Sequence, residues 1–258
     1  MMARDDDGED APRRGATARV LQVLTTLGAG QPPHSLADLA EATGLAKPTL
    51  LRLLRVLEDE GFAAQDRDSR WRLTTLVFEL GCSAVGLDHA MAEIRSALRS
   101  LAEVTGETVV YVVYDAGYTV YVETVESQHP IHTSVKLGNR VPALATATGR
   151  AMLAWLDTAE RDRVIDAGAA AAGTTPEALR AEIDETRTNG HAFNRDGLWP
   201  GVWGLGAPVF DRFGQVVGAV GLSAPVDRLP DDVGPVANAV ADAARQASAR
   251  AGAPVGSR

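Results

Sequence analysis

The strongest constraint on the fold is a stripe of leucines between two glycines near the start of the chain. At about 100° per residue, four leucines fall within a stripe about 100° wide on one side of a helix: Leu50, Leu53, Leu54 and Leu57. Arg52 and Arg55 lie on the opposite side. Gly44 supplies a tight turn before this helix, Pro48 is tolerated in its first turn, and Gly61 ends it. The pattern predicts a helix that buries one face and presents arginines on the other.

Two more helices are predicted before this one and a β-hairpin after it. The first has apolar residues at i, i+3, i+4 and i+7, namely Val20, Val23, Leu24 and Leu27, and ends near Gly28 and Gly30. Ser35 can cap the second. Residues 62–65 and 71–73 are typical of two strands joined by a polar turn, with Arg67, Arg70 and Arg72 at its tip. This order is typical of a winged helix-turn-helix, whose third helix reads the major groove of DNA. The alternative is a packing module with solvated charges.

The rest of the chain alternates between helix and strand patterns. A helical pattern over residues 75–101 is interrupted at 86–88. After Gly106 the residues become β-branched and aromatic, and we expect hairpins over 108–123 and 207–223. Helices are predicted over residues 148–156, 176–189 and 233–249. Hairpin-paired strands with helices around them imply an antiparallel sheet and an α+β fold class.

Composition and charge exclude several classes of function. The 258 residues carry a net charge of −9 at pH 7, so the chain does not bind polyanions indiscriminately, and DNA binding depends on placed residues. The single cysteine, Cys82, leaves no internal disulfide. No apolar run approaches the roughly 18 residues of a membrane span, and the start lacks the apolar stretch of a secretory signal. We therefore expect a cytoplasmic protein.

The sequence lacks the motifs of common enzyme classes. It has no glycine-rich phosphate loop and no nucleophile elbow. His129 and His132 stand three residues apart around Pro130, but no third metal ligand is suggested nearby. We expect no catalytic residue, no metal and no cofactor.

Short segments along the chain follow the order and spacing of one family. They are residues 35–40, 43–49, 52–54, 60–62, 71–73, 125–127, 138–142, 145–151, 200–202, 207–211 and 221–223. In these segments the chain resembles the IclR family of transcription regulators, from about residue 16 to residue 249. The resemblance implies a winged helix-turn-helix and a GAF-like sensor domain, dimers that pair into tetramers, and two partners: operator double-stranded DNA and a small-molecule effector.

The resemblance also indicates which residues contact DNA. The family's DNA-contacting segment falls on Lys47, Pro48, Thr49, Leu51 and Arg52. To these we add Arg55 and the hairpin arginines Arg67, Arg70 and Arg72. Many members have serine at the position of Pro48 and a polar or aromatic residue at that of Leu51. We therefore expect a different operator, with Leu51 placed to touch a thymine methyl group.

An effector pocket is implied in the sensor domain. Residues 145–149 are small, partly polar and directly before a helix, so backbone N–H groups there can hold a carboxylate; the alternative is a tightly packed helix entry. We expect a loop over residues 194–204, with Trp199 and Trp203, as a second wall. The effector-binding residues expected are Ala145, Thr146, Ala147, Thr148, Gly149, Asp196, Gly201, Trp203, Gly204 and Ser223.

Three departures from the family fall in this region. Leu144, Gly197 and Gly204 stand where many members have histidine, glutamate and cysteine. Fewer polar anchors favour an effector more apolar or aromatic than a small keto acid.

Together these inferences divide the chain and give it a function. We expect a disordered tail over 1–14, a winged helix-turn-helix over 15–75, linker helices over 76–104, a GAF-like effector domain over 105–250 and a flexible tail over 251–258. The predicted function is that of a sequence-specific regulator, a repressor of a catabolic or metabolic operon, whose effector is an organic acid or aromatic compound. The alternative is a ligand-sensing module that acts through protein contacts instead of DNA.

Overall fold

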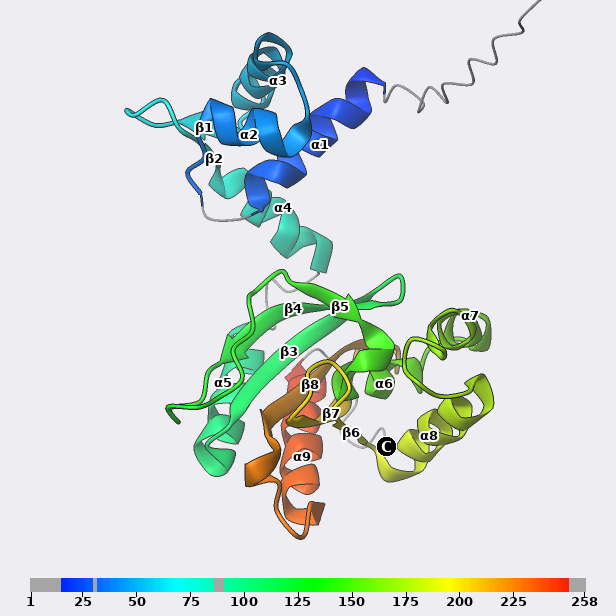
Figure 1. Ribbon diagram of the computed structural model, residues 1–258. Helices are drawn as coiled ribbons and strands as arrows, with labels where there is room; N and C mark the ends of the chain where they lie inside the picture. The colour runs from blue at the N-terminus through cyan, green and yellow to red at the C-terminus, as the bar shows by residue number, and fades with distance from the viewer. Residues whose placement is uncertain (1–14, 30–31, 86–90, 251–258) are drawn as a thin grey trace, which may run out of the picture. The chain divides into compact units, whose positions relative to one another are not determined.

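A computed structural model describes residues 15–29, 32–85 and 91–250 (Figure 1). The chain forms two compact units, residues 1–86 and 87–258. The tails expected at 1–14 and 251–258, the helix end at Gly30 and the break at 86–88 lie outside the described residues. Among the helices that the structure describes, none is both long and apolar enough to cross a membrane.

The N-terminal unit is a winged helix-turn-helix, as predicted. Its elements are α1 (Ala16–Gly28), α2 (Leu36–Thr43), α3 (Lys47–Asp59), β1 (Ala63–Gln65), β2 (Trp71–Leu73) and α4 (Thr75–Val85). Ser35 and Asp38 form a capping box at the start of α2, and Gly44 ends that helix with a φ of 68°. The leucine stripe of α3 is buried together with Trp71 of the hairpin. Local signals of capping, turn and periodicity therefore agree with the fold.

The C-terminal unit is an antiparallel sheet with helices on both faces. Its elements are α5 (Met91–Thr105), β3 (Thr108–Asp115), β4 (Tyr118–Val125), β5 (Arg140–Pro142), the 3-10 helix η1 (Ala143–Ala145), α6 (Ala147–Leu153), α7 (Thr158–Gly168), α8 (Pro176–Asn189), β6 (Ala192–Arg195), β7 (Val202–Phe210), β8 (Val216–Pro225), the 3-10 helix η2 (Val226–Arg228) and α9 (Gly234–Arg250). The strand order is β5-β4-β3-β8-β7-β6. The α+β class and the antiparallel sheet are confirmed.

Helix α6 packs directly on one face of this sheet because two strands carry glycine there. Gly206 on β7 pairs with Gly221 on β8. A Cβ at Gly206 would lie 2.5 Å from the backbone nitrogen of Thr148, and one at Gly221 would lie 2.3 Å from the Thr148 methyl carbon. The close approach of α6 thus requires both glycines. Helices α5 and α9 pack together and cover the opposite face.

The structure corrects part of the predicted C-terminal layout. Strand β7 begins at Val202 and β6 includes Asn194, so the true loop spans only 196–201, and Trp203 and Gly204 belong to a strand. Strands β5 and β6 and helix α7 were not predicted. Helix α5 buries Ile94 and Leu98 within this unit, whereas the boundaries proposed for a separate linker over 76–104 stay a prediction.

Candidate functional site

The solvent-facing side of α3 carries most of the residues expected to contact DNA. Lys47, Pro48, Leu51, Arg52 and Arg55 are exposed and Thr49 is half-buried. Leu51 stands out because 38% of its surface is accessible while the other leucines of the helix are buried. The helix thus has one apolar face in the core and one face with cationic and apolar groups free for a partner.

Arg55 differs from the other arginines because intramolecular contacts hold it. Its guanidinium is 2.5 Å from the carboxylate of Glu58 and 5.3 Å from the ring centre of Trp71, and it donates to the side chain of Gln65 at 3.4 Å. These contacts join α3 to the β-hairpin. An exposed ion pair of this kind adds little stability, so Arg55 mainly orients the hairpin against the helix.

The hairpin turn is fixed by Asp66. Its Oδ1 accepts hydrogen bonds from the backbone N–H groups of Asp68 and Arg70, both at 2.9 Å. Arg70 also donates to the carbonyl of Pro33 at 3.4 Å. Arg67 and Arg72, like Arg70, are exposed. The turn therefore presents basic side chains from a backbone held by its own hydrogen bonds.

In the C-terminal unit, a pocket lies between the start of α6, strands β7 and β8, and residues 197–199. Its volume is about 50 Å³. The lining residues are Val110, Tyr121, Ala145, Thr146, Ala147, Thr148, Asn194, Gly197, Leu198, Trp199, Val202, Trp203, Gly204, Leu205, Leu222 and Ser223. Hydroxyl and amide groups are thus set among apolar walls, which is typical of a small-molecule site.

Seven of the ten residues expected to bind the effector line this pocket, and Gly149, Asp196 and Gly201 do not. A Cβ at Gly149 would lie 2.1 Å from the carbonyl oxygen of Ala143, so this glycine allows η1 to pack on α6. Asp196 has a φ of 58° and accepts a hydrogen bond from the backbone of Gly201 at 2.6 Å. These two residues shape the turn before β7.

The two tryptophans have different surroundings. Strand alternation turns the side chain of Trp203 away from Gly204, onto the opposite face of the sheet, where its ring stacks on Phe193 with centroids 6.3 Å apart. Trp203 therefore reaches the pocket through its backbone. Trp199 lies in the loop beside the pocket and is 36% exposed.

The structure shows what surrounds each of the three positions at which the chain departs from the family. A Cβ at Gly197 would lie 2.3 Å from the amide nitrogen of Asn194 and 2.6 Å from the carbonyl oxygen of Ala145, so a larger residue cannot occupy this position without displacing them. Gly204 faces the carbonyl of Leu222 in the same way. Leu144 is buried outside the pocket, in the core that α7 and α8 cover.

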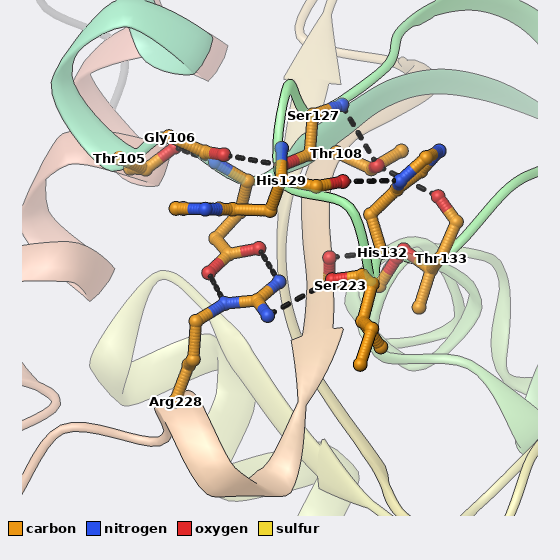
Figure 2. Close-up of polar contacts among 11 residues, drawn as sticks. Thr105, Gly106, Thr108, Ser127, His129, His132, Thr133, Ser223 and Arg228 are labelled. Atoms are coloured by element: carbon orange, nitrogen blue, oxygen red, sulfur yellow. Dashed lines mark hydrogen bonds and ion pairs between the residues drawn. The ribbon is translucent and has the colours of Figure 1, made fainter.

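Ser223 connects the pocket to a polar network (Figure 2). Its hydroxyl lies 2.7 Å from that of Thr133. The carbonyl of Thr133 accepts from the hydroxyl of Thr108 at 2.7 Å, and Thr108 accepts from the backbone of Ser127 at 3.1 Å. Ser127 in turn donates to the carbonyl of Gly106, directly after α5, at 2.6 Å. A continuous path of hydrogen bonds therefore runs from the pocket to the end of α5.

A partly buried ion pair lies beside the same network. The guanidinium of Arg228 donates to both carboxylate oxygens of Glu107 at 2.6 and 2.7 Å, and to the carbonyl of Ile131 at 2.9 Å (Figure 2). Its hydrogen bonds to Glu107 raise the pKa of Arg228. Because Glu107 is buried, this pair fixes η2 against the start of β3.

The side chains that line the pocket are neutral. Burial raises the pKa of Tyr121 to about 12, so its hydroxyl stays neutral at physiological pH. Thr146 caps α6 by accepting from the backbone N–H of Gly149 at 3.0 Å, and Thr148 donates to Thr146 at 3.3 Å. Within the described residues, no group of three His, Cys, Asp or Glu side chains could hold a metal ion. The pocket offers neutral polar groups and apolar surface.

Comparison with known proteins identifies the family. Residues 16–67 match the IclR helix-turn-helix domain, and residues 82–249 match the C-terminal domain of the bacterial transcriptional regulator IclR. The chain belongs to the IclR family. The glycerol operon regulatory protein of Streptomyces griseus is 32% identical to it over 242 residues, which cover 91% of this chain and 95% of that one.

Solved structures of IclR proteins have the same fold. The IclR regulator from Alicyclobacillus acidocaldarius is 28% identical, with a TM-score of 0.76 over 92% of this chain and 98% of that chain. An IclR homologue from Microbacterium hydrocarbonoxydans, solved in complex with 4-hydroxybenzoate, has a TM-score of 0.79 over 91% and 98%. It is only 18% identical, so this likeness concerns the fold alone. By its two family matches, the chain is a DNA-binding transcription regulator of the IclR family and not an enzyme.

Sequence reasoning missed several pocket residues of this IclR protein. Val110 and Tyr121 come from the first hairpin, and Leu205 and Leu222 from the second. Their strands were predicted, but the place where α6 covers the sheet was not. The signal was the glycine pair of β7 and β8, which indicates a close backbone approach.

Proposed function

We propose that this IclR regulator binds an operator through α3 and the β-hairpin, and that a small, mainly apolar effector in the pocket under α6 changes that binding. Lys47 and the hairpin arginines bind phosphates, and Arg52, Thr49 and Leu51 contact bases. The proposal rests chiefly on the exposed face of α3, where cationic residues and Leu51 stand free of the core.

The nature of the effector follows from the pocket. Hydroxyl and amide groups of Thr146, Thr148, Asn194 and Ser223 meet the apolar walls. We therefore infer an aromatic or largely apolar molecule with one polar or carboxylate group, a class to which the 4-hydroxybenzoate of the Microbacterium hydrocarbonoxydans homologue belongs. A cavity of about 50 Å³ is smaller than the roughly 150 Å³ that admits benzene. A ring-sized effector therefore requires the walls of the pocket to move apart.

The effect of the ligand is transmitted by the hydrogen bonds of Ser223. An effector that accepts a hydrogen bond from the Ser223 hydroxyl competes with Thr133 for that bond. Thr133 belongs to the path of hydrogen bonds to Gly106 and α5. The effector-free and effector-bound states then differ in the hydrogen bonds at the end of α5, and each state has a different operator affinity.

A homodimer, pairing into a tetramer, fits such a regulator. Helix α4 leaves Phe78 73% exposed and Leu80 50% exposed, and apolar side chains of this size favour burial against a second copy. Two winged helices in a dimer would contact two half-sites of one operator. Sedimentation of the parent protein and of Phe78→Glu measures this: we expect the variant to dissociate and the parent to stay associated.

The proposed function is tested by gel shift with DNA from upstream of the protein's own gene. We expect a discrete complex that resists excess unrelated DNA and weakens as salt rises. We propose a repressor, so 4-hydroxybenzoate or a related aromatic acid should release the DNA, and Ser223→Ala should respond less. Arg245→Ala, which changes an exposed arginine of α9, is the matched control.

The same experiment separates the alternative function. A module that acts through protein contacts would bind the aromatic acid, yet give no competitor-resistant complex at any salt concentration. A complex that forms equally with unrelated DNA would contradict operator recognition.

A further inference from the structure

A second and larger cavity lies beside the pocket, on the far side of Ala145 and Gly197. Its volume is about 580 Å³, within the range of roughly 300–1,000 Å³ that is usual for small-molecule sites. Helix α7 and the residues after it form one wall, and the β3–β4 turn, η1 and residues 195–197 form the other. The larger side chains that line it include Leu144, Arg150, Arg163, Val164 and Arg195, together with the smaller Ala167.

The cavity stays open because the residues that face it are small while its walls are anchored elsewhere. Ala167, Ala171 and Gly173 contribute little or no side chain to the cavity. Helix α7 is held by its buried residues Val164 and Ile165 and by ion pairs to α8, in which Arg180 contacts Asp162 and Asp166. Leu144 seats tightly against Gly168, where a Cβ would lie 2.5 Å from its Cδ1. Rigid elements therefore keep apart two walls that their side chains do not fill.

Three arginines from three different elements line this cavity, against one carboxylate. They are Arg150 on α6, Arg163 on α7 and Arg195 at the end of β6, and the carboxylate is Asp196. In a chain of net charge −9, such a group of guanidinium ions stands out. The charge and the geometry favour a negatively charged ligand.

A carboxylate contacts each of these arginines and uses part of its donors. For Arg195 it is Asp196 of the cavity itself, with 3.5 Å between Nε and Oδ2. Arg163 contacts Glu160 through Nε and Nη2, both at 2.7 Å. Arg150 contacts Glu182 through Nη1 at 2.7 Å and the carbonyl of Leu144 through Nε at 2.8 Å. A guanidinium has five N–H donors, so each retains donors beyond these contacts. Burial lowers the pKa of Arg150, and an anion beside it would offset that desolvation.

We propose that this cavity is a second ligand site, for a small organic anion that carries an apolar body. The guanidinium groups of Arg163 and Arg195 bind the anionic group, and the body lies on Leu144, Val164 and Ala167. The assignment does not depend on DNA binding or on the identity of the effector in the first pocket. Because the two cavities share Ala145 and Gly197, a test has to separate them.

Calorimetric titration of the full-length protein with benzoate tests the site. Benzamide serves as the uncharged analogue of the same shape, and inorganic phosphate as an anion without an apolar body. We expect benzoate to bind, and both benzamide and phosphate to bind at least about tenfold more weakly. If benzamide bound as tightly as benzoate, the site would not require an anion. If phosphate bound as tightly, the site would not require an apolar body. Either result would contradict the proposal.

Four variants locate the bound benzoate. Ala167→Phe fills the cavity from an exposed position of α7, and the double variant Arg163→Gln/Arg195→Gln removes two exposed cations. We expect each to raise the Kd for benzoate at least about tenfold. Because the first pocket is proposed to bind acids of the same class, the variants are compared in the Val202→Phe background, which obstructs only that pocket. In that background Arg245→Gln, which removes an exposed arginine elsewhere, should leave the Kd within about twofold.

Two further results would overturn the proposal. One is no binding of benzoate up to about 10 mM, which corresponds to less than about 3 kcal/mol of binding free energy. The other is binding that Val202→Phe abolishes and that Ala167→Phe and the double variant leave unchanged, which would assign benzoate to the first pocket alone. Circular dichroism of each variant shows whether it is folded, and the double variant decides the result if Ala167→Phe is not.

Discussion

The hydroxyl of Ser223 lies 2.7 Å from that of Thr133, and the Thr133 hydroxyl also lies 3.0 Å from the carbonyl oxygen of Ser223. Each hydroxyl has one proton. When Thr133 donates to the carbonyl, Ser223 donates to Thr133, and both protons are used within the pair. An acceptor that enters the pocket can receive a hydrogen bond from Ser223 only if the bond from Ser223 to Thr133 breaks. The hydrogen bond between Ser223 and Thr133 therefore depends on whether an acceptor occupies the pocket.

Replacing Thr133 by valine tests the contribution of this pair. Thr133→Val keeps the side-chain shape but removes a buried hydroxyl, leaving the half-buried Ser223 without its partner. We expect a loss of about 1–2 kcal/mol in the free energy of unfolding, measured by urea titration. Ser134→Ala removes an exposed hydroxyl one residue away and should cost less than about 0.5 kcal/mol. Equal losses for the two variants would contradict the role of the pair.

The N-terminal unit could be predicted almost fully from the sequence because its signals are local. The leucines of α3, the cap at Ser35 and the turn at Gly44 each act within a few residues, and the structure has each element where these signals indicate it. The contacts of Arg55 could not be predicted from the sequence. Its contacts to Gln65 and Trp71 depend on how the hairpin folds back, which periodicity does not encode.

The C-terminal unit was harder because packing overrides its local signals. Gly204 and Gly206 indicate a loop by the usual rules, yet both lie in β7. A Cβ at Gly206 would meet the backbone of α6, and one at Gly204 would lie 2.9 Å from the carbonyl oxygen of Leu222. Helix α7 buries only Val164 and Ile165 and so has a weak helical pattern. Trp203 was assigned to the pocket by its residue type, but the register of β7 turns its ring to the opposite face.

Gly206 should tolerate no side chain. In Gly206→Ala the new Cβ would lie 2.5 Å from the backbone nitrogen of Thr148, and backbone cannot yield as a flexible side chain does. We expect a loss of about 1–3 kcal/mol, or roughly 2–4 °C in Tm for each kcal/mol. The matched control is Gly81→Ala on α4, where nothing lies within 4 Å of the added Cβ. That variant should melt at the parent temperature or slightly above it, and a lower Tm in both variants would point to a general effect of losing glycine.

The attachment of α7 should weaken in acid. Hydrogen bonds from Arg163 and then from Tyr114 lower the pKa of Glu160 to about 2, below its ordinary value of 4.5. A carboxyl group with a depressed pKa in the folded state stabilises the fold above its unfolded pKa and loses that contribution as the pH falls toward the folded one. We expect the stability contributed by Glu160 to decline between about pH 5 and pH 2.

The variant Glu160→Gln makes that expectation measurable. It cannot titrate, so its unfolding midpoint in urea should fall less steeply with acid than that of the parent. Glu185→Gln, on the neighbouring helix α8, changes an exposed carboxylate and is the control. Parallel pH profiles of the parent and Glu160→Gln would contradict the role assigned to this carboxylate.

Arg52 and Lys47 should affect operator binding in different ways. Arg52 is exposed on α3, and we propose that it contacts bases, so Arg52→Ala should cost about 1–3 kcal/mol of operator binding and relax the choice of sequence. For Lys47, at the first turn of the same helix, we propose a phosphate contact. Lys47→Ala should weaken binding to all sequences alike and reduce the slope of log affinity against log salt by about 1. Fluorescence anisotropy with operator and scrambled duplexes at several salt concentrations measures both effects, with Arg245→Ala as the control. If Arg52→Ala bound the operator as tightly as the parent, base reading would have to come from other residues of α3.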